Sequence, residues 1–491
     1  MSETTKNRWN SNFGYLMVMT GAAIGLGNIW RFPYVLYSNG GWSFLIPYII
    51  AVLILGFSFS LLEHVIGYRF KKSFINIFYK IKPKFEYLAW FILLTIFLIV
   101  LYHATIIGWD LIYLFLSFFK GWGSDPNLFF ANDILMRDDS LNGLFLISPL
   151  VFMGTCIAWV IIWLISHKNI NKGISKISKI LVPLLFIMVT IFVLYSLTLP
   201  GASMGYKTMF SPDWNVLLNL DVWIAAFGQT LFSLSLGVGI LITYSSYLPK
   251  GAKLVKNTFI VLIINSGFEI FNTIGIFSIL GFMGIFGEIQ LYNIISQGKG
   301  IAFIALPQVF NAMGDVAYIL GPMFFLCILF VGIISIISLI EPFTHSISEK
   351  FDFSRKKSTT LICTIGFLAS MVFSTGFGSY LLIVYDSFLN NVALILGIVL
   401  ECVIFGWFYS IDDLMDLLNE NSFIKIGNWW KNIVKYVLPV VLSILLIKGA
   451  YDNILTSSIE ENIIVLILVL ILVIIPLILT NIKKKDSSAI S

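Results

Sequence analysis

Residues 20–33 read TGAAIGLGNIWRFP and lie inside an otherwise apolar segment that spans residues 12–36. Three glycines (Gly21, Gly25 and Gly27) fall near the middle of this segment. Each glycine inside a helix costs about 1 kcal/mol relative to alanine, so the cluster weakens the helix at its centre. In a bilayer, unwound backbone is tolerated only where it lines a site enclosed by protein. The stretch therefore predicts a broken helix that forms part of a binding site.

A second stretch of this kind, GQTLFSLSLGVG (Gly228–Gly239), interrupts the sixth apolar segment with small and polar residues such as Ser233 and Ser235. Glycines four residues apart, such as Gly21 and Gly25, also serve close helix packing. Two interrupted segments, five segments apart and both carrying polar side chains, favour a site over packing alone. Freed carbonyls suit a cation, and the N-terminus of a half-helix suits an anion.

The composition excludes several classes of protein. Of 491 residues, 58% are hydrophobic and 12% are charged, against about 45–50% and about 25% in soluble proteins. A soluble enzyme, a nucleic-acid-binding protein and a disordered scaffold are therefore excluded. Twelve apolar segments have the length that a bilayer requires: 12–36, 42–69, 87–118, 146–166, 178–198, 221–247, 257–283, 315–347, 359–376, 388–410, 431–450 and 460–482. They predict an all-α membrane protein with twelve transmembrane helices.

The charges predict how the chain crosses the membrane, because loops rich in Lys and Arg remain cytoplasmic. Basic residues gather in alternate connections: Lys6 and Arg8, Arg69–Lys84, Lys168–Lys179, Lys250–Lys256, Lys350–Lys357 and Lys483–Lys485. We therefore expect a multi-pass protein of the cell's inner (plasma) membrane with both termini in the cytoplasm. The sequence has no HExxH, GxSxG or CxxC motif, so no catalytic residues are expected and the protein is not predicted to be an enzyme.

The apolar segments also predict the organisation of the chain. A cytoplasmic N-terminal segment (1–11) precedes a first repeat (12–198), and a second repeat (221–410) contains an outer helical loop (284–314). Two further helices (431–482) and a cytoplasmic tail (483–491) follow.

Three stretches resemble the neurotransmitter:sodium symporter family, in particular its prokaryotic amino-acid transporters. They are GAAIGLGNIWRFPY (21–34) with NGGWSFLIPY (39–48), VWIAAFGQTLFSLSLGVG (222–239) and ITYSSY (242–247). The resemblance implies the LeuT fold, a five-plus-five inverted repeat with helices 1 and 6 unwound at mid-membrane and two C-terminal helices. It also implies sodium-coupled import of a free amino acid by alternating access, with no organic cofactor.

The family's first sodium site corresponds to the carbonyl of Ala23 and the side chains of Asn28, Ser233 and Asn265. In the family, the carboxylate of the substrate completes this shell. Taken singly, Asn28 and Asn265 could instead form interhelical hydrogen bonds.

The second sodium site is less complete in this sequence. Its ligands correspond to Gly21, Ile24, Val331 and Ser335, but a hydroxyl normal in the family is replaced by Ile334. Isoleucine has no oxygen to coordinate sodium. Coupling to one sodium ion, coupling to a proton, and a weakly bound second ion all remain open.

The resemblance implies a substrate pocket without fixed charge, which suits a neutral, hydrophobic or aromatic amino acid. Gly25 leaves room for the substrate carboxylate beside the N–H groups of Leu26 and Gly27. The implied substrate-binding residues are Ala23, Gly25, Leu26, Gly27, Ile99, His103, Phe232, Ser233, Ser235, Val238, Ser335 and Leu339.

His103 stands where the family has a tyrosine that contacts the substrate. The adjacent Tyr102 is expected to face about 100° away around the helix. Ionisable groups inside a membrane are functional by default, so His103 is a candidate for binding substrate or a proton; the alternative is a packing role.

Further charged residues match functional positions of the family. Glu269 corresponds to the position at which a carboxylate replaces chloride, near Tyr48, Gln229 and Ser233, which implies chloride independence. The implied outer gate consists of Arg31 and Asp386 with Phe232 as a lid. The inner gate region comprises Lys6, Arg8, Trp9, Tyr247 and Glu349. A purely structural ion pair is the alternative for each of these charges.

Three other functions remain as alternatives: a non-transporting amino-acid sensor on the same scaffold, an ion channel and, least favoured, an intramembrane enzyme. The expected partners are the amino acid and the lipid bilayer, and no nucleic acid. The oligomeric state is left open.

Overall fold

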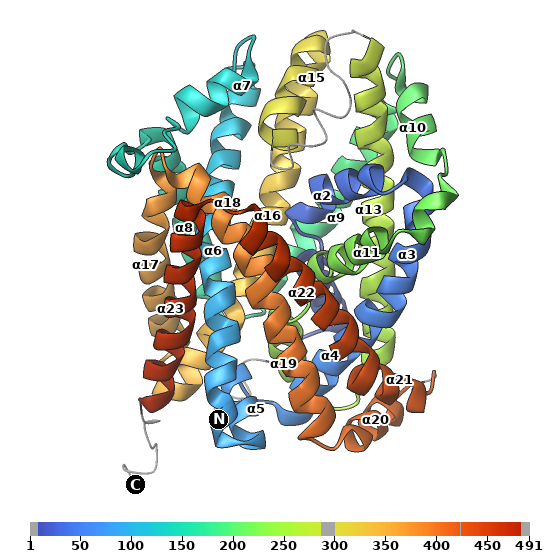
Figure 1. Cartoon of the computed structure of the whole chain (residues 1–491), viewed down its shortest axis with the longest axis vertical. Coiled ribbons are helices and arrows are strands. Elements are labelled where there is room, and N and C mark those ends of the chain that lie inside the picture. The colour runs from blue at the N-terminus through green and yellow to red at the C-terminus, as the bar shows by residue number, and fades with distance from the viewer. Residues whose placement is uncertain (1–7, 286–299, 423, 483–491) are drawn as a thin grey trace.

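The fold is a bundle of long helices, seen here in a computed structural model that describes residues 8–285, 300–422 and 424–482. Most helices run along the long axis of the molecule (Figure 1). Within the described residues, strand-like pairing is limited to one isolated bridge between Ile147 and Thr375. The predicted all-α class is therefore confirmed.

Ten helical spans in the described chain are long and apolar enough to cross a membrane. Their α-helices are, in order, α3 (Leu45–Ala51) with α4 (Ser58–Phe70), α6 (Glu86–Ser117), α8 (Pro149–Ser166), α9 (Ile174–Ser196), α13 (Leu254–Ile285), α16 (Ala317–Phe351), α17 (Arg355–Ser370), α18 (Gly378–Phe388) with α19 (Leu394–Trp407), α21 (Asn428–Asn432) with α22 (Leu438–Thr456), and α23 (Ile459–Asn481). Each overlaps one of the predicted apolar segments, although the span Gly378–Trp407 begins ten residues before the predicted segment 388–410.

The other two predicted segments are broken helices. The first consists of α1 (Asn12–Ala23) and α2 (Leu26–Ser38), whose axes differ by 49°. The sixth consists of α11 (Leu220–Ser233) and α12 (Ile240–Ser246), joined by six non-helical residues. If spans were assigned by helix length and composition alone, α11 would be joined to the preceding helical stretch Ala202–Leu218. The two are bent by 118° relative to each other. Because so sharp a turn does not cross a bilayer, we assign the sixth span to α11 and α12.

Short helices lie at both ends of the bundle (Figure 1). At one end, which the charge pattern predicts to be extracellular and which we call the outer end, lie α7 (Pro126–Leu128), α10 (Ala202–Phe210) and α15 (Leu306–Ala312). At the opposite, inner end lie α5 (Phe74–Ile81) and α20 (Ile411–Glu420). Of the predicted outer loop 284–314, residues 300–314 are largely helical and 286–299 lie outside the described residues.

Long helices pack closely around the broken ones. α16 packs against α6, α9 and α17, α1 packs against α9 and α16, and α12 packs against α4. The close approach of α6 to α8 depends on two glycines, since a Cβ added to Gly154 would lie 2.5 Å from the carbonyl oxygen of Gly108. This packing encloses both helix breaks in protein, as unwound backbone in a membrane requires.

Candidate substrate and sodium site

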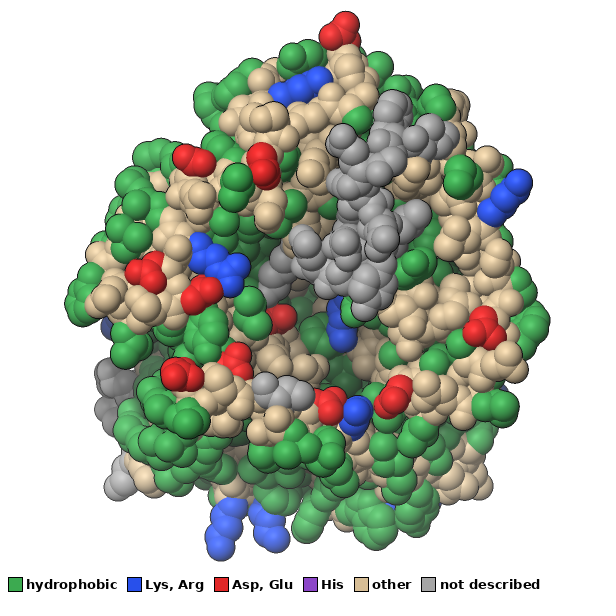
Figure 2. Space-filling model, turned by 45° about the horizontal axis from the view of Figure 1, so that its top comes forward, with side chains coloured by type: hydrophobic (Ala, Val, Ile, Leu, Met, Phe, Trp, Pro, Cys, Tyr) green, Lys and Arg blue, Asp and Glu red, His purple; other side chains and the backbone are tan. Residues whose placement is uncertain are grey.

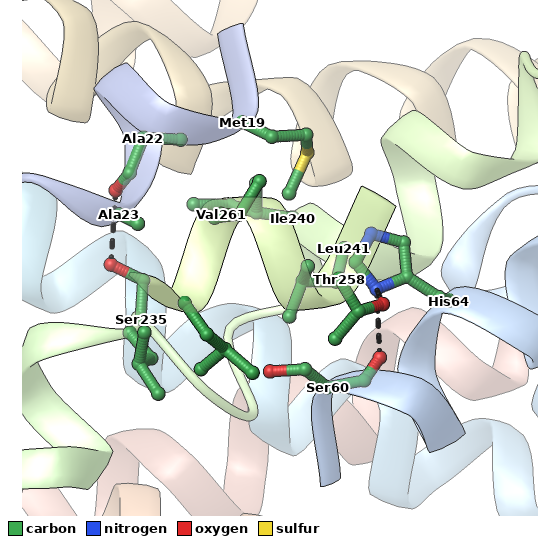
Figure 3. Close-up of a pocket in the computed structure, with 12 residues that line it drawn as sticks. Met19, Ala22, Ala23, Ser60, His64, Ser235, Ile240, Leu241, Thr258 and Val261 are labelled. Carbon is green, nitrogen blue, oxygen red and sulfur yellow. Dashed lines mark hydrogen bonds between the residues drawn. The ribbon is translucent and has the colours of Figure 1, made fainter. Parts of the chain in front are cut away.

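The two helix breaks have different backbone geometry. In the first, Ile24 and Gly25 are extended (Gly25 φ −107°, ψ −179°), and α2 starts again at Leu26. In the second, Gly237 adopts a φ of +70°, and a Cβ there would lie 2.0 Å from the side chain of Ile398. Only glycine fits this position, both in conformation and in space. The second break is further fixed by Ser235, whose hydroxyl donates a 3.1 Å hydrogen bond to the carbonyl of Ala22 (Figure 3).

Three polar side chains from three different helices meet at the breaks. Asn28 Nδ2 donates to Asn265 Oδ1 (2.9 Å) and, more weakly, to Ser233 Oγ (3.4 Å), while Asn265 Nδ2 donates to Ser233 Oγ (2.5 Å). The carbonyl oxygen of Ala23 lies nearby, 3.9 Å from where a Cβ on Gly25 would be. All four residues assigned to the first sodium site from the sequence therefore lie together, and their neutral oxygens suit a hard cation.

The residues of the second sodium site fit an ion less well. A Cβ on Gly21 would lie 2.8 Å from Cγ2 of Ile334, so the isoleucine packs directly against α1 at this position. Ile24 and Val331 are buried beside it, and Ser335 instead lines the neighbouring cavity. Ile334 thus contributes methyl groups at the position where the sequence resemblance led us to expect a hydroxyl.

A cavity of about 270 Å³ adjoins the oxygen cluster. Ten of the twelve predicted substrate residues line it: Gly25, Leu26, Gly27, Ile99, His103, Phe232, Ser235, Val238, Ser335 and Leu339. The other two, Ala23 and Ser233, belong to the oxygen cluster. The wall also includes residues that the sequence analysis did not single out, such as Trp30, Ile106 and Leu236.

Tyr102 adds a further polar group to the cavity. It lines the wall together with the adjacent His103. Its hydroxyl donates to Asp386 Oδ1 (2.8 Å) and accepts from Asn390 Nδ2 (3.0 Å), which also donates to Asp386 (2.9 Å). Asp386 and Asn390 are four residues apart and therefore lie on one helix face. This spacing is the feature of the sequence that could have predicted their joint contact with Tyr102.

The outer boundary of the cavity is formed by an arginine stacked on an aromatic ring. The guanidinium carbon of Arg31 lies 3.8 Å from the centre of the Phe232 ring. Arg31 and Asn391 line both this cavity and a recess of about 540 Å³ at the outer end, which Figure 2 shows as a hollow. Asp386, the predicted partner of Arg31 in the outer gate, lies on the wall of the same cavity. The stack therefore separates the cavity from the outer recess.

The residues predicted for the inner gate lie in two groups. The indole Nε1 of Trp9 donates to the carbonyl of Tyr244 (2.8 Å), and its backbone N–H donates to the carbonyl of Tyr247 (3.3 Å). Glu349 instead pairs with Lys72 (3.3 Å) and accepts from the backbone N–H of Ser73 (2.7 Å). The side chain of Arg8 is exposed. Lys6 lies outside the described residues.

A buried ion pair at the inner end was missed by the sequence analysis. Arg355 Nη1 and Nη2 donate to the two oxygens of Glu341 at 2.7 and 2.6 Å, and Tyr247 Oη donates to the same carboxylate at 3.2 Å. Arg355 Nε also donates to the carbonyl of Lys168 (2.8 Å). The pair ties α16 to α17, to α12 and to the connection after α8.

Glu269 occupies the position predicted for a chloride substitute and is fully buried. Its carboxylate accepts a 2.9 Å hydrogen bond from Gln229 Nε2 and a short one from Tyr48 Oη, which also contacts Ser266 Oγ at 3.1 Å. Of the three neighbours expected from the sequence, Tyr48 and Gln229 donate these hydrogen bonds, and the side chain of Ser233 is also hydrogen-bonded to the carboxylate. The carboxylate lies one helical turn from Asn265 of the oxygen cluster.

A model of the sodium:neurotransmitter symporter family matches residues 6–143 and 124–481. The chain belongs to this family. As a family member it is a multi-pass, sodium-dependent membrane transporter and not an enzyme.

Three relatives illustrate the similarity. An uncharacterised sodium-dependent transporter of Methanocaldococcus jannaschii is 38% identical over 93% of each chain. The sodium- and chloride-dependent creatine transporter 1 of Bos taurus is 29% identical, over 84% of this chain and 72% of that protein. The crystal structure of MhsT in complex with L-phenylalanine matches with a TM-score of 0.77 and 29% identity, and covers 90% of this chain and 99% of MhsT. The predicted LeuT fold is thereby confirmed.

Proposed function

We propose that this transporter imports a neutral, apolar amino acid together with one sodium ion, by alternating access and without chloride. The observation that carries the proposal is the convergence of Asn28, Ser233 and Asn265 between two broken helices, directly beside a cavity. Uncharged oxygens from three helices suit a sodium ion, and an amino acid in the cavity would share that ion's shell.

The broken helices supply fixed charges for both ends of an amino acid. The N-terminus of α2 carries a partial positive charge, and the N–H groups of Leu26 and Gly27 there suit a carboxylate. The C-terminus of α11 ends at Ser233 and carries a partial negative charge, which suits an ammonium group and the sodium ion. A carboxylate bound at α2 would also reach the sodium ion, so substrate and ion would stabilise each other.

The rest of the cavity supports an apolar side chain. Ile99, Phe232, Val238 and Leu339 offer hydrocarbon surface, and MhsT, a relative with the same fold, forms a complex with L-phenylalanine. His103 adds a polar group to this wall, with which a substrate carboxylate could form a hydrogen bond.

The proposal of one sodium ion rests on Ile334, which packs against Gly21 in the region of the second site. A tenfold sodium gradient supplies about 1.4 kcal/mol per ion, and a membrane potential of about 100 mV adds about 2.3 kcal/mol per charge. One ion therefore provides about half the driving force of two.

The absence of a chloride requirement rests on Glu269. Its buried carboxylate is held by Tyr48 and Gln229 and lies one turn from Asn265. A fixed negative charge here would balance the sodium ion, so no mobile anion is needed.

Alternating access requires an outer and an inner barrier. The stacked Arg31–Phe232 pair is suited to the outer barrier. Trp9 and the Glu341–Arg355 ion pair are suited to the inner barrier. We propose that the first repeat (12–198) and the second repeat (221–410) move relative to each other around the site, with residues 431–482 outside the repeats. Both termini would then lie in the cytoplasm.

Uptake of radiolabelled amino acids into proteoliposomes tests the proposal. We expect concentrative uptake of a few apolar amino acids when the external solution contains sodium, and none when potassium replaces it. Binding without uptake would show a sensor, and an unsaturable current would show a channel.

A further inference from the structure

His64 lies on α4 (Ser58–Phe70) behind the helix breaks and plays no part in the proposed site. Its side chain is 1% exposed and faces a small cavity of about 10 Å³. This cavity is enclosed by residues of α1, α4, α12 and α13 and by the second break (Figure 3). Its volume is at the lower limit of what one water molecule needs. The sequence analysis did not single out this histidine.

The hydrogen bonds of His64 define which ring nitrogen carries a proton. Nδ1 lies 2.9 Å from the carbonyl oxygen of Ser60, which only accepts, so Nδ1 is the donor. The hydroxyl of Thr258 lies 3.1 Å from Nδ1 and gives its own hydrogen to the carbonyl of Leu254 (3.0 Å). Nδ1–H is therefore shared between Ser60 and Thr258. In the neutral ring, Nε2 then carries a lone pair.

Nε2 of His64 is buried and has no hydrogen-bond partner among the described residues. The ring of Tyr15, on α1, lies edge-on at 6.2 Å, and its hydroxyl is likewise buried without a partner in the described chain. Two neighbouring rings, one on α1 and one on α4, thus each carry a buried polar atom without a hydrogen-bond partner among the described residues. Tyr15, Met19 and Ala22 share one helix face, which borders this region.

Within the described part of the chain, the groups that face the His64 ring are uncharged: Tyr15 from α1, Leu241 from α12 and Thr258 from α13. Of these, Tyr15 is the titratable one. The neighbouring carboxylate of Glu63 is directed to the second break, where it accepts from the N–H of Gly237 (3.3 Å). An imidazolium at His64 would have no counter-ion here, and burying an unpaired charge is strongly unfavourable. The ring is therefore neutral in this conformation.

Hydration of His64 depends on the position of α1. This helix is hinged at Ile24–Gly25, where its axis differs by 49° from that of α2, and its inner end is held by the hydrogen bond from Trp9 to Tyr244. Met19, Ala22 and Ala23 of α1 form one wall of the cavity, so separation of α1 from α12 and α13 would open this wall. That movement would admit water to Nε2.

We propose that His64 is a proton-binding site of the transport cycle, neutral while α1 packs against α4 and protonated at Nε2 when α1 moves away. The proton comes from water at the inner side and adds to the Nε2 lone pair, and it leaves when α1 packs again. By linkage, acid on the inner side stabilises the inward-open form and slows return of the empty transporter.

The first test is a histidine NMR titration of the full-length protein in detergent. The chain has four histidines, and His64→Gln assigns the His64 signal. Trp9→Ala removes the bond that holds α1, so we expect the His64 midpoint to rise by about one pH unit or more relative to wild type, which corresponds to a tenfold change in proton affinity. Equal midpoints in wild type and Trp9→Ala, with the chemical shifts of an exposed histidine in both, would overturn the proposal.

The second test measures uptake in proteoliposomes as the inner pH is lowered from about 8 to about 5, the range in which histidine changes charge. Acid inside should slow uptake by the wild type. It should slow uptake by the control variant His167→Gln equally, because His167 lies at the end of α8, away from this cavity. Uptake by His64→Gln should be much less sensitive. An unchanged pH profile in His64→Gln would contradict the proposal. This second test rests on the proposed function. If no amino acid is taken up at any pH, the proposed function is wrong. The NMR titration does not depend on uptake and still tests the proposal for His64.

Discussion

Ile334 packs against Gly21 so closely that a Cβ at position 21 would lie 2.8 Å from the Cγ2 atom of the isoleucine. The contact joins α16 to α1 beside the first helix break. It places hydrocarbon where the resemblance described above implies an oxygen ligand. This contact underlies the proposed coupling to one sodium ion.

Replacing Ile334 by threonine should create a second sodium site. Threonine is β-branched like isoleucine but has a hydroxyl, which would face the backbone of Gly21. We expect the sodium dependence of amino-acid binding to change from a Hill coefficient of about one to a value approaching two, since occupancy of two sites would become linked. Scintillation proximity binding at varied sodium concentration measures this change.

Ile336→Thr provides the control, because Ile336 is equally buried but lies about 200° around α16 from Ile334. It should leave the Hill coefficient unchanged. A coefficient of two already in the wild-type protein would contradict the single-ion account.

Replacing Asn265 by alanine should weaken sodium binding without unfolding the bundle. Asn265 contacts both Asn28 and Ser233, and a hydrogen-bond or dipole contact to a charged group contributes about 1.5–3 kcal/mol. Sodium affinity should therefore fall about tenfold or more. The matched control is Asn257→Ala, which removes a buried asparagine of the same helix that bonds to Asn12 at the inner end. Equal losses in both variants would mean that Asn265 acts only through packing.

Replacing Glu269 by glutamine should make transport depend on chloride. The amide keeps the size of the side chain but removes the negative charge beside Tyr48 and Gln229. Uptake by Glu269→Gln should be low in gluconate and recover in chloride, whereas the wild type should be indifferent to this exchange. Glu401→Gln, which neutralises another fully buried carboxylate, is the control and should stay indifferent. Chloride-stimulated uptake by the wild type would count against this role.

Breaking the Glu341–Arg355 pair should destabilise the inner end of the bundle. Arg355→Gln leaves the carboxylate of Glu341, which is 2% exposed, without its bidentate partner. Removing one member of a buried ion pair typically costs about 3–5 kcal/mol, so the melting temperature should fall clearly. The double variant Glu341→Gln/Arg355→Gln should recover part of the loss.

The more exposed Lys72–Glu349 pair serves for comparison, because surface ion pairs contribute about 0–1 kcal/mol. Lys72→Gln should therefore change the melting temperature little. A similar effect of Lys72→Gln and Arg355→Gln would contradict the structural importance of the buried pair.

The sequence allowed the spans and the two breaks to be predicted because both follow from local properties. The thickness of the bilayer sets the length of an apolar segment, and clustered glycines weaken a helix wherever they occur. The positions of Asn28, Ser233 and Asn265 in the site followed from the resemblance of the surrounding motifs.

The Glu341–Arg355 pair could not be predicted in this way. It depends on how the chain reverses between α16 and α17, where Asp352 adopts a left-handed conformation (φ +55°). The hydrogen bonds of Tyr102 to Asp386 and Asn390 were also not predicted, because they join α6 to the span Gly378–Trp407, which lies far from it in the sequence. His64 has no sequence signal beyond being a histidine in an apolar helix.

The most direct test of the central claim is a thermal-shift measurement on the purified protein with each of the twenty amino acids. The measurement is made in sodium and then in potassium at equal ionic strength. We predict that a few apolar amino acids raise the melting temperature in sodium alone, and that Asn265→Ala clearly reduces this increase at the same sodium concentration. Equal stabilisation in sodium and potassium would contradict sodium coupling at Asn28, Ser233 and Asn265.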